Sequence, residues 1–109
     1  MASESRLTQC RPDGWRLSGA LDFGTVTGLL AEMDRLLREQ ARQGLQQLEI
    51  DLSDLGSANS AGLAFLLECA EMARERGIHL TYHQLPNSLN RIAAFSNLQP
   101  LLPLTPHPE

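Results

Sequence analysis

Ser60 is the first candidate for a functional residue in this sequence, because it lies among unusually small neighbours. The run Gly-Ser-Ala-Asn-Ser-Ala-Gly, residues 56–62, separates two hydrophobic stretches. A serine hydroxyl can act as a nucleophile, receive a phosphoryl group or cap a helix. The hydrolase pattern Gly-x-Ser-x-Gly fails, since Ala58 stands where its first glycine belongs. Nucleophilic hydrolysis is therefore disfavoured, and the other two roles stay open.

No other residues assemble into a catalytic or metal site. The sequence contains no lysine, which excludes a Walker A lysine and a Schiff-base amine. Cys10 and Cys69 are separated by most of the chain and form neither a disulfide framework nor a zinc pair, so we expect both to be reduced. His79 and His83 would lie roughly 13 Å apart along a strand, too far to chelate one metal. We predict no catalytic residues, no cofactor and no metal, and hence no enzyme.

The small residues around Ser60 fit the start of a helix. Asn59 or Ser60 is expected to be the N-cap, with its side-chain oxygen accepting from a free backbone amide. Capping explains one polar residue, but it does not require Ala61 and Gly62 to be small as well. A helix start without bulky side chains exposes backbone amides and lets another surface approach closely. A phosphate or a helix of a partner protein would fit there.

Hydrophobic periodicity predicts the elements that position this run. Period-two alternation indicates strands, and spacing of three and four indicates amphipathic helices. Gly44 and Gly77 are expected to end the first two helices. The predicted strands cover residues 6–11, 15–21, 45–52 and 78–83, and the predicted helices cover residues 26–43, 63–76 and 88–95.

This order predicts an α/β fold: one domain with a small mixed β-sheet and helices packed mainly on one side. The loops after the second and third strands, Gly-Ala-Leu-Asp-Phe-Gly-Thr and residues 56–62, should lie at the same edge of the sheet. We place the domain at residues 1–102. Residues 103–109 are rich in proline and are predicted to form a flexible C-terminal tail.

Composition limits the partners. A chain of 109 residues has room for one core, and a net charge of -4 with interleaved arginines gives no basic face for nucleic acid. No apolar run approaches the length of a membrane span, so no direct membrane insertion is expected. The first ten residues do not read as a secretory signal, which predicts a cytoplasmic protein.

Two motifs resemble the STAS domain family, which includes the anti-sigma factor antagonists. Ile-Asp-Leu-Ser-Asp-Leu followed by Gly-Ser-Ala-Asn-Ser-Ala-Gly-Leu resembles the family's strand-to-helix signature, and Leu-Ser-Gly-Ala-Leu-Asp resembles the motif at the end of its second strand. The similarity extends over residues 7–102. The last third, Asn-Ser-Leu-Asn-Arg-Ile-Ala-Ala-Phe onward, resembles the MlaB subgroup, the STAS subunits of the Mla phospholipid transporter.

The resemblance assigns roles to individual residues. Ser60 falls on the position that is phosphorylated in anti-sigma factor antagonists and that belongs to the contact with the MlaF ATPase in MlaB. It is therefore a candidate phosphorylation site. Asn59 replaces the family's usual aspartate, which weakens a phosphorylation switch. Asp22 should lie on the same rim, although local capping of the following helix explains it equally well. The predicted partner-binding residues are Asn59, Ser60, Ala61, Gly62, Leu63 and Asp22.

The resemblance implies a non-catalytic subunit that binds and supports the ATPase, similar to MlaF, of a phospholipid ABC transporter within a permease complex. Such a transporter maintains the lipid asymmetry of the outer membrane, and this subunit would sit peripherally at the inner face of the inner membrane. The alternative is a phosphorylation-regulated anti-sigma factor antagonist, bound by a serine kinase and released after modification of Ser60.

Overall fold

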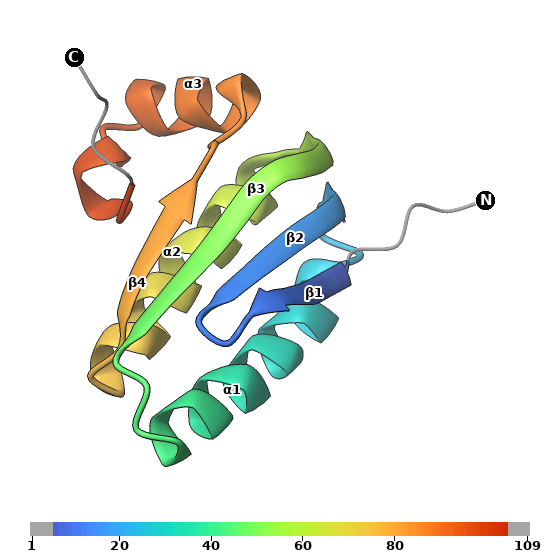
Figure 1. Ribbon diagram of the computed structural model, residues 1–109. Helices are drawn as coiled ribbons and strands as arrows, with labels where there is room; N and C mark the ends of the chain where they lie inside the picture. Colours follow the sequence, from blue (N-terminus) through green and yellow to red (C-terminus); the bar gives the residue numbers. More distant parts are fainter. Residues whose placement is uncertain (1–5, 105–109) are drawn as a thin grey trace.

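The computed structural model describes residues 6–104, which form a four-stranded sheet with three helices (Figure 1). The chain begins with a hairpin and then alternates helices with strands, as the sequence predicts. The elements are β1 (Arg6–Arg11), β2 (Gly14–Leu21), α1 (Val26–Arg42), β3 (Gln47–Ala58), α2 (Ser60–Glu75), β4 (His79–His83), α3 (Asn87–Phe95) and a short 3-10 helix η1 (Gln99–Leu101).

The sheet is mixed, and its strands follow the order β1-β2-β3-β4. β1 pairs antiparallel with β2, while β2–β3 and β3–β4 are parallel pairs. α1 and α2 lie behind the sheet in Figure 1, α3 lies beyond the end of β4, and no helix crosses the front face. The predicted α/β fold, with a small mixed sheet and helices mainly on one side, is confirmed.

The helices form where apolar residues recur at helical spacing. In α1 the buried residues include Leu29, Met33, Leu36 and Leu37, which form one stripe against the sheet. Gly44 follows the helix with a φ of 78°, a left-handed conformation that glycine adopts without strain. The predicted stop at Gly44 is thus confirmed.

Tyr82 joins β4 to α2 in the centre of the core. Its hydroxyl donates to the backbone oxygen of Leu66 at 2.7 Å, and its side chain is 1% exposed. Burial raises the pKa of Tyr82 well above its ordinary value, because the phenolate could not be solvated there. Burial likewise raises the pKa of the Cys69 thiol, so this cysteine is a packing residue without reactive thiolate character.

β3 is longer than the sequence predicts, and this corrects the expected loop at residues 56–62. The strand continues past residue 52 to Ala58, because its last part pairs with the end of β2: Asp54 with Ser18, Leu55 with Gly19, and Ala58 with Leu21. The small-residue run therefore contains the end of a strand, the single residue Asn59 and the first turn of α2.

The chain after η1 returns to the sheet. The backbone N–H of Tyr82 donates to the Pro103 oxygen at 2.8 Å, and Leu104 forms a parallel bridge with Tyr82. Pro103 and Leu104, which we assigned to the tail, therefore lie against β4. The rest of the predicted tail, residues 105–109, lies outside the described residues. Among the described residues, no helix combines the length and the apolar character needed to cross a membrane.

Candidate functional site

The candidate site begins where two parallel strands end side by side. Leu21 of β2 pairs with Ala58 of β3, and the backbone N–H of Asn59 donates to the Leu21 oxygen at 3.2 Å. Gly19 has a φ of 93° next to a register shift in β2, which requires glycine at this point of the sequence motif. Asp22 and Asn59, the residues that follow the two strands, are thereby held at one rim.

Asn59 is the N-cap of α2, and this decides between the two capping candidates. Its Oδ1 accepts from the backbone N–H of Ala61 at 2.9 Å. Ser60, the first residue of α2, is exposed, and among the side chains that the structure describes its hydroxyl forms no hydrogen bond. We call Asn59 and Ser60 the α2 tip. The cap leaves the hydroxyl of the α2 tip available to another molecule.

Two of the predicted contact residues, Gly62 and Leu63, turn toward the domain itself. A Cβ at Gly62 would lie 2.8 Å from the Leu21 Cβ and 3.3 Å from the Leu21 oxygen. Leu63 is 3% exposed and Ala61 is 7% exposed. Gly62 therefore packs closely against Leu21 of β2, and Leu63 belongs to the hydrophobic core. Contact of these residues with a partner stays a prediction.

Asp22 organises the turn between β2 and α1. Its Oδ1 accepts from the Gly24 N–H at 2.9 Å, and its backbone oxygen accepts from the N–H groups of Thr25 and Val26, each at 3.1 Å. The Thr25 hydroxyl donates to the Ala20 oxygen at 3.0 Å. The carboxylate thus holds the turn at Gly24, and the start of α1, whose N-cap is Thr25, has no side-chain cap. Local capping of this helix by the Asp22 side chain, the alternative given from the sequence, is therefore wrong. It remains half-buried on the rim beside the α2 tip.

Next to the α2 tip, α1 and α2 enclose an apolar groove of about 510 Å³ that the sequence analysis missed. We call it the α1–α2 groove. The turn before α1 contributes Phe23, which is 76% exposed, and α1 contributes Val26 and Leu30. The residues from α2 are Ala61, Ala64, Phe65, Glu68 and Met72.

The sequence did carry a signal for this groove. The five α2 residues recur at spacings of three and four, and they form a second stripe beside the stripe that faces the sheet. Phe23, in contrast, lies in a turn where periodicity gives no information. Glu68 is the only ionisable residue that lines the groove, and within the described part of the chain it makes no salt bridge.

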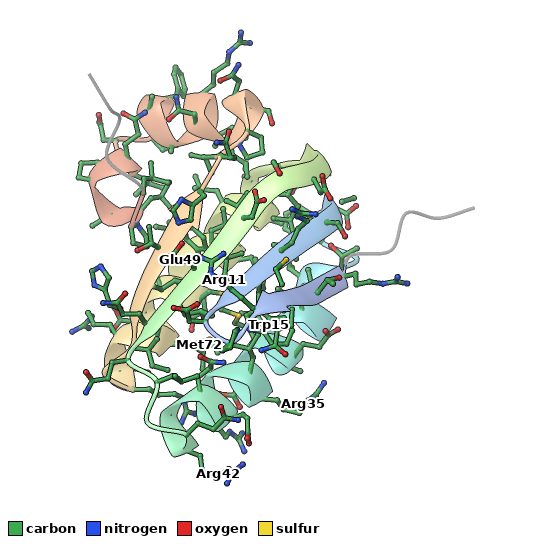
Figure 2. All side chains as sticks on the ribbon, viewed as in Figure 1. Arg11, Trp15, Arg35, Arg42, Glu49 and Met72 are labelled. Carbon is green, nitrogen blue, oxygen red and sulfur yellow. The ribbon has the colours of Figure 1, made fainter. Side chains whose placement is uncertain are left out.

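The opposite face of the sheet carries charges that pair with one another. Arg11 and Glu49 meet at 2.6 Å over this face (Figure 2), and Glu49 also lies 2.9 Å from His83. Arg16 lies 3.4 Å from Asp51. In residues 6–104 no three His, Cys, Asp or Glu side chains gather in a way that could hold a metal ion.

These features describe a small α/β domain with an uncovered helix start beside an apolar groove, an arrangement that suits binding to another protein. The family model described as "Mlab, STAS domain" matches residues 11–103. The chain therefore belongs to the STAS domain family, as its two motifs indicated. Domains of this family are generally binding or regulatory modules without catalytic activity.

Solved structures show the same fold. The anti-sigma factor antagonist SpoIIAA in its unphosphorylated form matches with a TM-score of 0.68 and 15% identity, over 96% of this chain and 89% of that chain. An anti-sigma factor antagonist from Mycobacterium paratuberculosis matches with a TM-score of 0.66 and 18% identity, over 97% and 87% of the two chains. At these identities the likeness shows the fold alone. The search of curated proteins found no match.

Proposed function

We propose that this chain is the STAS subunit of an Mla-type phospholipid ABC transporter and that it binds the transporter's ATPase through the α2 tip. The observation that supports this most directly is the exposed Ser60 hydroxyl, which forms no hydrogen bond among the described side chains because Asn59 caps the helix in its place. The match to an MlaB-type family model supports the choice of transporter. The transporter would maintain lipid asymmetry in the outer membrane, and this subunit would lie at the cytoplasmic side of the inner membrane.

In this mechanism the chain binds the ATPase and catalyses no reaction itself. The partner's surface presses against Ser60 and the exposed ring of Phe23, which lie at the same end of the two helices. Exposed aromatic rings often contribute strongly to binding when a partner buries them. Since the chain lacks lysine, the lysine of a Walker A motif comes from the ATPase. Binding of the subunit would then stabilise the active arrangement of the ATPase.

The test is the affinity of the purified chain for the ATPase of an Mla-type transporter from the same organism. Ser60→Arg places a long cation on the α2 tip and should weaken binding about 100-fold. The matched control is Ser88→Arg, since Ser88 is also an exposed serine in the first turn of a helix. Both variants should unfold at nearly the wild-type temperature. Unchanged affinity of Ser60→Arg, or no binding by the wild type, would contradict the proposal.

The exposed Ser60 hydroxyl also favours a second candidate, a phosphorylation-regulated antagonist of an anti-sigma factor. A phosphate on Ser60 would lie at the positive end of the α2 dipole, where free backbone amides favour an anion. Incubation with an anti-sigma factor serine kinase and ATP, followed by intact mass, tests this candidate. One added phosphoryl group, absent in Ser60→Ala, would support it, and an unchanged mass would count against it.

A further inference from the structure

We infer that the α1–α2 groove receives an amphipathic helix of the partner, with a lysine or arginine of that helix placed against Glu68. This inference rests on the proposed function and specifies how the partner is recognised. The groove is continuous with the α2 tip, because Ala61 follows Ser60 directly and lines the groove. One partner can therefore cover both surfaces.

The walls of the groove select a helix over an extended segment. Apart from the turn that carries Phe23, both walls are helices, α1 and α2, whose backbone groups beyond the first turn are bonded within each helix. An extended peptide needs an open strand edge, and here it would bury backbone N–H and C=O groups without partners. A helix satisfies its own backbone and presents only side chains.

The length of the groove agrees with this occupant. Ala61 and Met72 line its two ends on α2, and eleven residues of helix rise roughly 16 Å. About three turns of a partner helix cover that distance. Ala61 and Ala64 have small side chains that leave room at the end near the α2 tip, so a bulky apolar side chain of the partner fits there beside Phe23. Met72 at the other end has a flexible side chain that adapts to its neighbours.

The negative charge of Glu68 indicates that the partner helix carries a positive charge at this position. Glu68 is exposed and lies among apolar lining residues, and among the described residues it forms no salt bridge. The neighbouring acid Glu71, by comparison, is paired with Arg74 on the same helix. A partner without a cation at this position would leave the Glu68 carboxylate unpaired as the groove closes, which is unfavourable. A basic residue at the middle of the docked helix removes that cost.

Charge reversal tests this inference on the complex with the ATPase. Glu68→Lys should weaken binding by about ten-fold or more, because attraction becomes repulsion. The control is Glu75→Lys, which makes the same charge change on an exposed residue at the other end of α2, outside the groove. A single Lys→Glu or Arg→Glu change on a surface helix of the ATPase should restore binding to the Glu68→Lys variant. Ala64→Trp, which fills the groove without adding charge, should also weaken binding.

The outcomes separate the two proposals. If Ser60→Arg disrupts the complex while Glu68→Lys and Ala64→Trp bind like Glu75→Lys, the groove inference is overturned and the proposed function stands. If no charge reversal on the ATPase restores binding, the pairing at Glu68 is wrong. If the wild-type chain does not bind the ATPase, the proposed function falls, and the inference falls with it.

Discussion

The open face of the sheet and the helical side of this domain differ in how their charged side chains are paired. On the open face of the sheet, Arg11, Arg16 and their carboxylate neighbours pair with one another. On the other side, the α1–α2 groove is apolar and holds one carboxylate, Glu68, that forms no salt bridge within the described residues. A surface whose charges are paired internally gains little from a partner, whereas an uncovered apolar groove gains from being covered. The comparison therefore supports the proposal that a partner binds at the groove and the α2 tip.

The largest effect expected from a change beside that surface concerns Gly62, and it separates packing from docking. In Gly62→Ala the new Cβ would lie 2.8 Å from the Leu21 Cβ, so α2 must move away from β2. We expect the free energy of unfolding to fall by about 1–3 kcal/mol.

The control for this change is Gly28→Ala. Gly28 lies in α1 with nothing within 4 Å of a new Cβ, and alanine should stabilise the helix by about 1 kcal/mol. Thermal unfolding of both variants should thus shift in opposite directions. A stabilised Gly62→Ala variant would mean that the small residues near the tip are not required for packing.

A smaller effect is expected at Asn59, and it sharpens the division of roles within the α2 tip. Asn59→Ala removes the acceptor for the Ala61 N–H and should destabilise the domain by about 1 kcal/mol. Asn59→Asp keeps an acceptor at the same place and should restore stability. Denaturant unfolding measures both changes. If Asn59→Ala leaves the free energy of unfolding unchanged, the Asn59 cap does not fix the start of the helix. The cap would then not explain why the Ser60 hydroxyl is available.

The smallest effect is expected on the open face of the sheet. A change there tests whether the two surfaces really differ in partner binding. Arg16→Ala removes ion pairs to Asp51 and Asp54 at 3.4 and 3.8 Å, both partly exposed to solvent. Stability should fall by less than about 1 kcal/mol. Affinity for the ATPase should not change, and a clear loss of affinity would show that the sheet face also binds the partner.

The same variant has a pH signature at Asp51. Partial burial opposes ionisation of this carboxyl, yet the hydrogen bond from the Ser53 N–H and the nearby Arg16 hold its pKa below the ordinary value. Because the folded-state pKa is lowered, the stabilising contribution is complete above the unfolded-state pKa and is lost as pH falls through the folded-state value. Arg16→Ala should raise the pKa of Asp51, which an NMR titration can follow.

Most of the fold could be predicted from hydrophobic periodicity, and the exceptions have physical causes. The helices and the hairpin follow from local patterns, and the glycine stops were found at Gly44 and Gly77. The end of β3 was missed because glycine, serine and alanine have low strand propensity, and pairing with β2 decides their conformation. No local pattern contains that pairing.

The site was predictable only in part, for a similar reason. The sequence located the helix start but left Asn59 and Ser60 as equal capping candidates, since either side chain could reach a free amide. The α1–α2 groove depends on how two helices lie against each other and on the turn that exposes Phe23. Both are properties of the assembled domain.

The return of the chain to β4 also limits how copies of this domain can join. Leu104 lies along β4 at Tyr82, so that border of the sheet is partly occupied by the chain's own C-terminal segment. β1, a strand of six residues with an arginine at each end, borders the sheet on the other side. Growth of a fibre by strand addition requires two open borders on every copy. With the β4 border partly occupied, strand addition is expected mainly at β1, and two copies paired through β1 would leave no fully open border for a third copy.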